Sequence, residues 1–528
     1  MIGLGRRIAF ATLAIGVIAG LEGAWAEEPK RGGILNVAVT AEPPTTDCHA
    51  SGTFATIHHV APHYSTLLKV DAERYPEIVG DVAQSWEVAA DGLTYVFKLR
   101  PNVVFHDGTP FTSADVRASW ERLKNPPEGI ASLRKETFSN IRAIEVPDAG
   151  TVVIRVTEKD QSMPAIFASP WNCLYSAAKL KSDPRYPEKT VMGTGPFRFV
   201  ERVPGSHWVG ERFEKYFVPG QPYLDGFRNV LLSSSALINS LQGGQVDVEF
   251  RGVTPAERDR LVQALGPKIK AEESPFLIML LLAFNTERPP FNDARVRRAL
   301  SLAIDRWSGG EALGRTTILK HVGGMLRPGY ALAPEPAELE KLPGWGRSPA
   351  ASREEARRLL KEAGIGNLSF KLANRSIAQP YGPLAVYLID QWRQIGVTVE
   401  QVSLETAAYF NTLANGTFDV AVEFQTDYID DPSVQWTKYL SHDRSNANSA
   451  RYIDREVDSL FDRQRRAGDA AERRQLLRQL EARVIEQGYW APLFWYQRIV
   501  MHGEAVKGWR VTPSYLINQD YATIWLAR

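Results

Sequence analysis

The stretch Phe276-Leu-Ile-Met-Leu-Leu-Leu-Ala-Phe284 is nearly all apolar and has the length of one β-strand. A strand that is apolar on both faces is typical of a sheet covered by helices on its two sides. Residues 293–306 follow it with the pattern of an amphipathic helix. The inward face of this helix is predicted to consist of Val296, Leu300, Ala303 and Ile304. Together, the two segments predict α/β architecture.

Strand and helix patterns alternate along the rest of the chain, which is typical of an α/β protein. Further strands are predicted at residues 34–39, 93–99, 151–156, 246–250, 368–373, 397–402 and 418–424, and near Trp495 and Ile524. Helices are predicted after the capping-box-like pair Thr112 and Asp115, at 236–241, 382–395 and 407–414, and as a helical pair over 455–487. With 528 residues, the chain is too long for one hydrophobic core, so two or more lobes are expected.

The N-terminal residues have the pattern of a secretory signal peptide. Arg6 and Arg7 precede an apolar run over residues 8–20, and Ala24-Trp25-Ala26 forms an A-x-A cleavage site. We expect cleavage after Ala26 and export to the periplasm, because the apolar run is too short to span a bilayer. The predicted mature chain contains no later apolar run of membrane-spanning length.

Charge and cysteine content restrict the function further. Without residues 1–26 the chain is close to neutral, which argues against a nucleic-acid-binding protein, because phosphate neutralisation requires a basic face. Cys48 and Cys173 are the only cysteines. An even number of cysteines in an exported protein favours one disulfide, and two buried thiols are the alternative.

Patterns for catalysis and metal binding are weak. Ser176-Ala-Ala-Lys179 and Ser132-Leu-Arg-Lys135 have the S-x-x-K spacing of β-lactamases, but no Ser-Asp-Asn or Lys-Thr-Gly accompanies them. His59 and His63 would share one face of a helix, yet Pro62 lies between them and no acidic or thiol ligand is close by. We therefore expect no catalytic residue, no cofactor and no metal. A secreted hydrolase is the alternative from another functional class.

A series of motifs carries a resemblance to one family. In chain order they are Asp81-Val-Ala-Gln-Ser-Trp86, Asp91-Gly-Leu-Thr-Tyr95, Val104-Phe-His-Asp-Gly108, Gly193-Thr-Gly-Pro-Phe197, Leu241-Gln-Gly-Gly-Gln-Val-Asp247, and Asn285-Thr286 ahead of Pro290-Phe291. With these motifs in this order, the chain resembles the family 5 extracellular solute-binding proteins, which include dipeptide, oligopeptide and nickel receptors. Most of the motif residues are expected to be turn and core positions of the scaffold.

The resemblance implies a periplasmic-binding-protein type II-like fold with two lobes, a hinge and an inserted third domain. Domain I would combine residues 27–55, 188–283 and 496–528, domain II would be 56–187, and domain III would be 284–495. Two crossing segments near residues 283 and 496 would act as the hinge when the lobes close around a ligand.

The resemblance also implies a partner and a ligand class. The protein would be a monomer that delivers a solute to the transmembrane subunits of an ABC permease. A short peptide or another amine-and-carboxylate compound is the expected solute. Metal chelates, sugars and opines are the alternatives within the family.

Asp427 is the first candidate ligand contact. It follows the strand predicted at 418–424, and the carboxyl ends of strands are where α/β sheets bind ligands. The resemblance to peptide-binding members implies that Asp427 holds the ligand's ammonium group and that Phe424 stands where those members often have tryptophan. Gln425 and Tyr428 belong to the same stretch. The alternative is a loop aspartate that caps a turn.

Three further groups of residues are candidates. Dipeptide-binding members have an arginine close to Arg375 that pairs with the ligand carboxylate, a role that suits the planar guanidinium. The loop Ser51-Gly52-Thr53, together with Phe54, resembles a ligand-facing loop of dipeptide receptors and would hold a carbonyl or carboxylate through its backbone. Trp495 and Tyr496 would line the cleft. The alternatives are a surface arginine, a plain connecting loop and core aromatics.

Overall fold

The computed structural model describes residues 27–528 except 131, 136, 250 and 378. The predicted signal peptide at 1–26 lies outside the described residues. One large mixed sheet runs through most of the described molecule, and the short β13 (Leu319–His321) pairs with it at β17. Its other strands, in spatial order, are β15 (Thr398–Leu404), β14 (Ser369–Arg375), β16 (Val420–Thr426), β12 (Ile269–Phe284), β17 (Trp490–Gly503), β11 (Val248–Glu249), β1 (Ile34–Val39), β10 (Gly226–Leu231), β9 (His207–Arg212) and β8 (Phe197–Val203).

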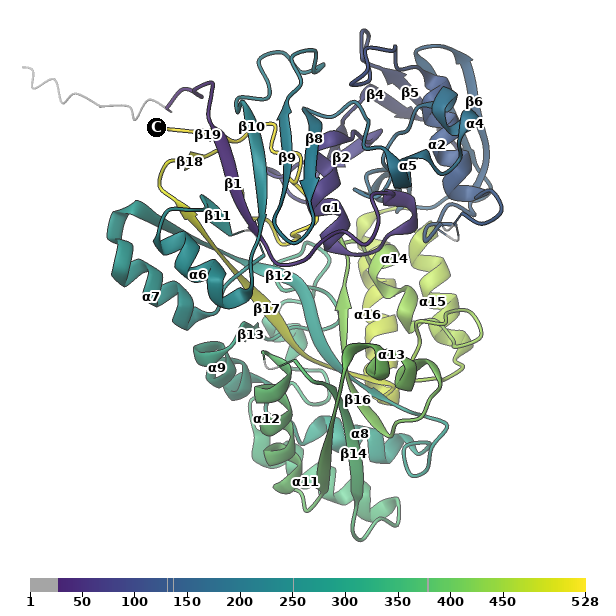
Figure 1. Cartoon of the computed structure of the whole chain (residues 1–528). Helices are drawn as coiled ribbons and strands as arrows, with labels where there is room; N and C mark the ends of the chain where they lie inside the picture. Colours follow the sequence, from purple (N-terminus) through teal and green to yellow (C-terminus); the bar gives the residue numbers. More distant parts are fainter. Residues whose placement is uncertain (1–26, 131, 136, 250, 378) are drawn as a thin grey trace, which may run out of the picture.

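The sheet is shared by two lobes, which lie above and below one another in Figure 1. We call the part built on β1 and β8–β11 the upper lobe and the part built on β13–β16 the lower lobe. A smaller side domain stands beside the upper lobe. It holds a separate antiparallel sheet, whose strands in order are β4 (Ala83–Val88), β5 (Thr94–Leu99), β7 (Thr151–Val156) and β6 (Ile141–Asp148).

The strands β12 and β17 connect the two lobes. Residues Ile269 to Pro275 of β12 pair antiparallel with the C-terminal half of β17, and Met279 to Ala283 pair with its N-terminal half. The ladder is interrupted between Pro275 and Met279. Figure 1 shows both strands running diagonally between the lobes. The apolar stretch that predicted a covered strand is therefore the lower-lobe half of a longer strand that crosses the molecule.

Helices cover both faces of the apolar strands in the lower lobe, whereas the side-domain sheet has a partly exposed face. The upper lobe has α6 (Ser234–Gln242) and α7 (Pro255–Leu265), and the side domain has α2 (Ser113–Lys124), α3 (Met163–Phe167), α4 (Ala177–Ser182) and α5 (Tyr186–Lys189), with α1 (Phe54–Val60) ahead of it. The lower lobe has α8 (Ala294–Leu302), α9 (Arg306–Thr316), α10 (Pro336–Leu339), α11 (Pro349–Glu362), α12 (Tyr381–Arg393), α13 (Thr406–Ala414), α14 (Pro432–Gln435), α15 (Arg455–Arg466) and α16 (Ala470–Gln487). Among the described residues, no helix combines the length and apolar composition that a bilayer crossing requires.

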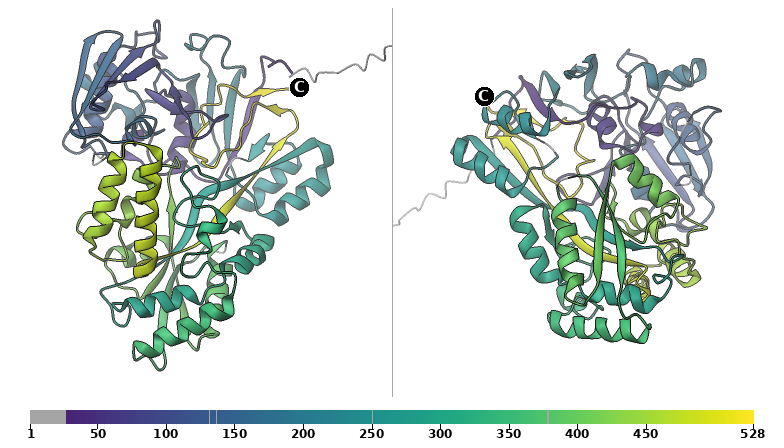
Figure 2. Two further views of the ribbon diagram at one scale, coloured as in Figure 1. Left: turned by 180° about the vertical axis from the view of Figure 1, so that it is seen from behind. Right: turned by 60° about the horizontal axis from the view of Figure 1, so that its bottom comes forward.

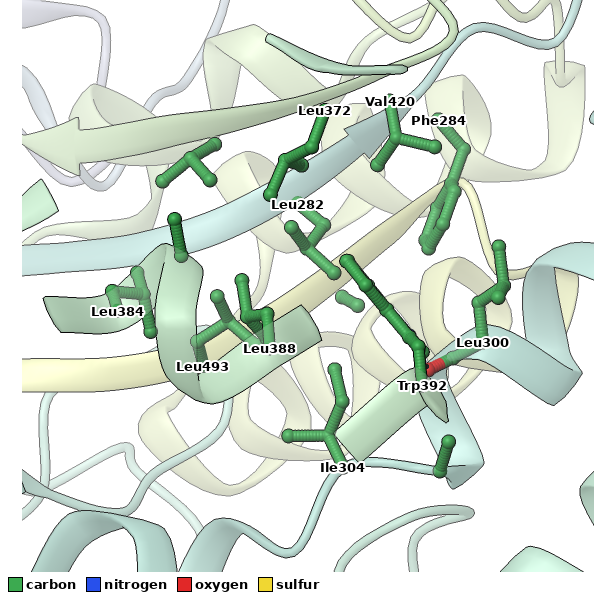
Figure 3. Close-up of a cluster of buried hydrophobic side chains, with 14 of the residues drawn as sticks. Leu282, Phe284, Leu300, Ile304, Leu372, Leu384, Leu388, Trp392, Val420 and Leu493 are labelled. Carbon is green, nitrogen blue, oxygen red and sulfur yellow. Dashed lines mark hydrogen bonds between the residues drawn. The ribbon is translucent and has the colours of Figure 1, made fainter. Parts of the chain in front are cut away.

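The lower lobe contains the core drawn in Figure 3. Trp392 of α12 is fully buried there between α8 and the sheet, and its indole N–H donates to the carbonyl of Leu300 at 2.9 Å. Leu282 of β12 and Leu493 of β17 belong to the same cluster. This core holds the lower lobe together independently of the upper lobe, which has its own cluster around β1.

Several predicted elements are confirmed and others need correction. The strands predicted at 34–39 and 151–156 are β1 and β7, and Thr112 and Asp115 form the capping box of α2. The helix predicted over 293–306 is wrong in its extent, because Asp305 caps a second helix by accepting from the Ser308 N–H. The strand predicted at 246–250 is reduced to Val248–Glu249.

Candidate functional site

A cavity of about 660 Å³ separates the side domain from the lower lobe. Its wall on the side domain comes from residues 133–140 and 162–172, and its wall on the lower lobe comes from residues 427–465. Figures 1 and 2 show α14 and α15 directly beneath the side domain. We call this space the interlobe cavity. Its size is within the range of pockets that enclose small organic ligands.

Asp427 lies in the lower wall of the interlobe cavity, one residue past the end of β16. One carboxylate oxygen accepts from the Tyr428 backbone N–H at 2.8 Å. Burial raises the pKa of Asp427 to about 6, although the Tyr428 N–H and the positive charge of Arg134 oppose this rise. A carboxylate with few internal hydrogen bonds at a cavity wall can accept from a cationic ligand group.

Arg134 faces this aspartate from the side domain. Its guanidinium lies 4.6 Å from the centre of the Trp171 ring and donates to the backbone carbonyl of Ser51. Both Arg134 and Trp171 line the interlobe cavity. No carboxylate of a described residue lies within 4.0 Å of the guanidinium, and burial lowers the pKa of Arg134 to about 10, so it stays charged at neutral pH.

Arg134 and Trp171 were not predicted as site residues. Arg134 lies inside the stretch Ser132-Leu-Arg-Lys135, whose only recognisable pattern is the weak S-x-x-K spacing. Nothing in the local pattern separates this arginine from a surface arginine. Its position at the cavity follows from the docking of the side domain on the lower lobe, which no local signal reports.

The other predicted residues of the stretch around Asp427 have different roles. Tyr428 is buried, and its hydroxyl donates to the carbonyl of Ala165 in the side domain at 2.9 Å. Gln425 is also buried, and its amide donates to the Met325 carbonyl while its oxygen accepts from Tyr439. The structure therefore places Gln425 in the interior of the lower lobe, and Tyr428 at the contact between the two walls.

Arg375 is the last residue of β14, whereas the strand predicted at 368–373 placed it just past the strand end. Its guanidinium donates to Tyr381 and Thr406, and its Nε has no partner among the described residues. The rings of Tyr381, Phe410 and Phe424 lie 5.2, 5.5 and 5.9 Å from the guanidinium carbon. Phe424 thus belongs to the surroundings of Arg375.

Arg375 and Asp427 lie on neighbouring strands but not side by side. Ala373 of β14 is paired with Ala421 of β16 in a parallel ladder. Arg375 is two residues past this pair and Asp427 is six residues past it, which separates them by about 13 Å along the strands. The structure therefore does not bring these two predicted residues into contact with each other, and of the two only Asp427 lines the interlobe cavity.

Trp495 and Tyr496 lie on β17 near the interruption of the β12 ladder. Trp495 is fully buried in the lower lobe, and its indole N–H donates to the carbonyl of Gly324 at 3.1 Å. The ring of Tyr496 lies 6.3 Å from that of Phe276. Tyr496 is close to Tyr381 and Arg375, whereas Trp495 is a core residue.

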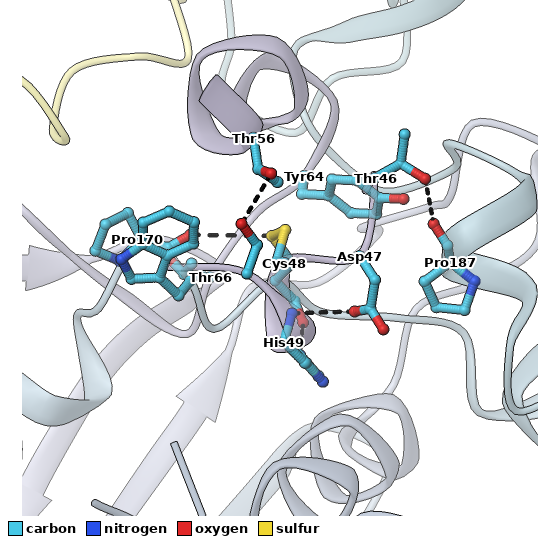
Figure 4. The surroundings of a disulfide bond; sticks show 12 residues. Thr46, Asp47, Cys48, His49, Thr56, Tyr64, Thr66, Pro170 and Pro187 are labelled. Atoms are coloured by element: carbon cyan, nitrogen blue, oxygen red, sulfur yellow. Dashed lines mark hydrogen bonds between the residues drawn. A yellow bond between two sulfur atoms is a disulfide. The ribbon is translucent and has the colours of Figure 1, made fainter. Parts of the chain in front are cut away.

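The loop predicted to face a ligand is held by a disulfide (Figure 4). Cys48 and Cys173 are bonded, with their Cα atoms 6.1 Å apart. The Ser51 hydroxyl is buried and donates to Thr56 at 2.9 Å, and Thr53 caps α1 through the Ala55 N–H. The side chains of Ser51 and Thr53 thus form hydrogen bonds within the protein.

The remaining residues of this loop are accessible. Gly52 is exposed next to Leu133, at the edge of the interlobe cavity. Phe54 begins α1, and its ring contacts that of Tyr515 at 5.8 Å and the Arg251 guanidinium at 4.4 Å. Backbone groups near Gly52 and the Phe54 ring therefore remain candidates on the upper side.

The candidate metal-binding histidines are part of the core. The Nδ1 atom of His59 lies 2.7 Å from the carbonyl of Ala55. His63 lies 2.8 Å from the carbonyl of Phe197 and accepts from the Trp208 indole at 2.9 Å. Burial lowers the pKa values of His59 and His63 to about 4 and about 3, so both stay neutral.

A second cavity, of about 340 Å³, lies between residues 61–81 and residues 510–523. Of its two basic residues, Lys69 has Asp520 at 3.1 Å and Asp81 at 3.7 Å, and Arg510 has Glu73 at 3.4 Å. The charges in this cavity are therefore largely compensated by protein groups, in contrast to those of the interlobe cavity.

The side domain and the lower lobe are joined by several polar contacts. The Asp430 backbone N–H donates to the Tyr75 hydroxyl at 3.0 Å, and the Gln161 N–H donates to the Arg465 carbonyl at 2.8 Å. The side chain of Arg465 also pairs with the buried carboxylate of Asp160. These contacts close one side of the interlobe cavity.

Two lobes joined by paired strands, with a polar cavity between facing walls, define a ligand-binding protein of the periplasmic-binding type. The sequence profile of the bacterial extracellular solute-binding proteins, family 5 (middle region), matches residues 77–446. The match covers more than half of the chain, and the chain belongs to this family. The resemblance inferred from the motifs is thereby confirmed.

Curated relatives extend the likeness over most of the chain. Heme-binding protein A of Haemophilus influenzae is 26% identical over 460 residues, covering 82% of this chain and 81% of the relative. Glutathione-binding protein GsiB of Escherichia coli K12 is 25% identical over 471 residues, covering 85% and 86% of the two chains. By these descriptions, both relatives are binding proteins.

Solved structures show the same fold. The ABC transporter substrate-binding protein CtaP of Listeria monocytogenes has a TM-score of 0.82 and 21% identity, with 94% of this chain and 100% of CtaP covered. The periplasmic binding protein DppA of Helicobacter pylori, solved with the peptide STSA, has a TM-score of 0.79, 22% identity and coverage of 94% and 99%. AgaA of A. tumefaciens R10, solved with agropinic acid, has a TM-score of 0.78, 23% identity and the same coverage. The predicted fold class is confirmed.

Proposed function

We propose that this protein captures a small solute carrying amine and carboxylate groups in the interlobe cavity and delivers it to the membrane permease of an ABC importer. The observation that carries the proposal is Asp427, a carboxylate with a single described donor at the wall of the cavity between the side domain and the lower lobe. A desolvated carboxylate favours a cationic partner, and a ligand ammonium is the partner that this position can receive.

The descriptions of the relatives support a small solute as the ligand. Proteins of similar sequence are named for binding glutathione and heme, and proteins of similar fold were solved with a peptide and with agropinic acid. These compounds are chemically diverse, so fold alone does not select among them. In this chain the selection comes from Asp427, since Arg375 is not among the residues that line the interlobe cavity.

Lobe closure would couple binding to transport. A ligand shifts a two-state protein toward the closed form only when it binds that form more tightly. Tyr428 and Asp430 contact the side domain directly, so closing the lobes brings both walls of the cavity onto the ligand. The paired strands β12 and β17 would bend where their ladder is interrupted, close to residues 275–279.

We further infer export to the periplasm, a monomeric state and no enzymatic activity. The neutral predicted mature chain, the signal-peptide pattern at 1–26 and the binding proteins among its relatives support these inferences. Incubation of the purified protein with a peptide pool tests the last point, because a receptor returns every peptide intact. Cleavage products would instead favour a hydrolase.

The central test is calorimetric titration of wild type and Asp427→Asn with short peptides that have a free amino terminus. We expect the substitution to weaken binding at least tenfold, because a charged hydrogen bond in a closed site contributes about 1.5–3 kcal/mol. Asp390→Asn, which removes an exposed carboxylate on α12, is the matched control. An affinity within about threefold of wild type for Asp427→Asn contradicts the proposal.

A second measurement tests closure itself. Small-angle scattering should show a smaller radius of gyration after addition of a ligand that calorimetry has shown to bind. An unchanged radius with a saturated binding site would contradict the two-lobed mechanism.

A further inference from the structure

Two opposite charges of the interlobe cavity have no ion-pair partner among the described residues, whereas its other charged lining residues, Arg444 and Arg465, pair with Asp462 and Asp160. Asp427 comes from the lower lobe and Arg134 from the side domain, and both line the same space. They are more than 4.0 Å apart and so form no ion pair with each other. Asn172 lies on the same wall as Arg134, is fully buried, and its side-chain oxygen has no partner among the described residues.

These groups leave hydrogen-bonding capacity for a ligand. An arginine carries five N–H donors, and the one described hydrogen bond of the Arg134 guanidinium is to the carbonyl of Ser51. The Trp171 ring below it fixes the plane of the guanidinium. A buried polar atom without a partner costs free energy, so the Asn172 oxygen and the Arg134 donors favour a polar guest.

We infer that the ligand presents a free α-amino acid head group, with ammonium and carboxylate on one carbon, to Asp427 and Arg134. This inference rests on the proposed function, because it specifies the ligand of the same site. The ammonium binds Asp427 and the Asn172 oxygen, and the carboxylate binds the Arg134 guanidinium. A head group of this kind must be joined to the rest of the ligand through its side chain or its nitrogen.

The chemistry separates this class from ordinary peptides. In an α-linked peptide the first residue has no free α-carboxylate, because that group forms the peptide bond and leaves a neutral carbonyl beside the ammonium. A guanidinium that lacks an acidic partner binds a carboxylate much more strongly than a carbonyl, because two parallel charged hydrogen bonds form. Arg134 therefore selects for a head group linked through its side chain.

The test uses two isomeric tripeptides, γ-glutamyl-alanyl-glycine and α-glutamyl-alanyl-glycine, which have the same composition and net charge. Calorimetric titration of the full-length mature protein should show the γ-linked isomer binding at least tenfold more tightly. Arg134→Gln should reduce this preference to less than threefold by weakening the γ-linked isomer alone. Arg134→Lys, which keeps the charge without the planar fork, should retain part of the preference.

Several outcomes overturn the inference. They are an α-linked isomer that binds as tightly as the γ-linked one, an equal loss for both isomers in Arg134→Gln, and an absence of binding for both. The γ-linked isomer with its α-carboxylate amidated gives a check on wild type that needs no variant, and it should bind at least tenfold more weakly. The proposed function fails separately, if no amine-bearing solute loses affinity in Asp427→Asn.

Discussion

Asp47 and Asp427 are both aspartates that face an arginine, but they differ in the number of hydrogen-bond donors that the protein supplies to the carboxylate. Asp47 accepts from Arg122 at 2.6 Å, from the Tyr175 hydroxyl at 2.9 Å and from the His49 N–H at 3.0 Å. Burial by itself would raise the pKa of Asp47, but its neighbours His49, Arg122 and Tyr175 bring it below the ordinary value. Asp427 has one internal donor and a pKa raised to about 6 by burial.

The difference separates a structural charge pair from a binding one. Around Asp47, protein groups occupy the carboxylate fully, so the pair holds the loop at residues 48–54 in place next to the disulfide. Around Asp427, the carboxylate and the facing Arg134 lie at a cavity without an ion-pair partner among the described residues. Both regions contain an aspartate and an arginine, and they differ in the number of described donors to the carboxylate.

The largest expected effect on stability comes from breaking the buried pair of Asp47 and Arg122. Arg122→Met should lower the free energy of unfolding by about 3–5 kcal/mol, because it leaves the Asp47 carboxylate buried without its cation. Arg134→Met should change it by less than about 1 kcal/mol, since no described carboxylate lies within 4.0 Å of the Arg134 guanidinium. Urea unfolding of both variants measures the contrast. Equal losses in the two variants would remove the distinction between the two regions.

The disulfide beside Asp47 should give the next largest effect. It closes a loop of 125 residues between Cys48 and Cys173, so its removal frees the unfolded chain considerably. Replacing both cysteines by alanine should lower the free energy of unfolding by about 2–5 kcal/mol. Wild type unfolded in the presence of a thiol reductant is the matched comparison and should agree with the double variant. A loss below about 1 kcal/mol contradicts this prediction.

Asp427→Asn should stabilise the ligand-free protein by up to about 3 kcal/mol at pH 7, in contrast to Asp47→Asn, which should destabilise it. The pKa of Asp427 rises from 3.8 to about 6 on folding, so its ionised form disfavours the folded state. This cost is absent below about pH 4, grows as the pH rises to about 6, and is constant above. Unfolding free energies of wild type and Asp427→Asn between pH 4 and 8 measure it.

The opposite pH dependence of the Asp427→Asn effect would contradict the expected cost of ionising Asp427 in the folded protein. If the advantage of Asp427→Asn grew as the pH fell, Asp427 would be a stabilising ionised group like Asp47. Its role as an unpaired ligand contact would then be contradicted.

The smallest expected effect concerns an exposed pair between the same two walls. Glu158 and Arg466 approach to 3.3 Å, and both side chains are about half exposed. Glu158→Gln should change ligand affinity less than twofold, because exposed ion pairs contribute less than about 0.5 kcal/mol. Asp160→Asn, which alters the buried partner of Arg465, should have a larger effect in the same titration. Equal effects of the two substitutions on ligand affinity would show that the burial of an ion pair does not determine its contribution.

Local patterns predicted much of the scaffold. The apolar run of β12, the alternation of β5 and β7 and the capping box at Thr112 each depend on residues close in sequence. The break at Leu302 was missed because the apolar spacing continues to Ile304, while Asp305 begins a new helix through its own side chain. A helix end is missed when the apolar spacing continues past it and a capping side chain starts a new helix.

The candidate site was predicted only in part. Asp427 was found because it follows a strand whose end can be located from its apolar residues. Gln425 and Trp495 were also predicted as ligand contacts. Inside the lower lobe, however, Gln425 donates to the Met325 carbonyl and Trp495 donates to the Gly324 carbonyl. A side chain's partners come from distant segments, so local sequence does not separate a ligand contact from an internal one.

The sequence by itself determined the elements, the family and the position of one acidic residue at a strand end, because these depend on periodicity and on motifs of neighbouring residues. The tertiary structure decided which charges remain without partners. Arg134 and Asp427 are about 300 residues apart in the chain, and they face one another because the side domain docks on the lower lobe. Charge compensation acts through space, so only the folded chain distinguishes the occupied aspartate at position 47 from the open one at 427.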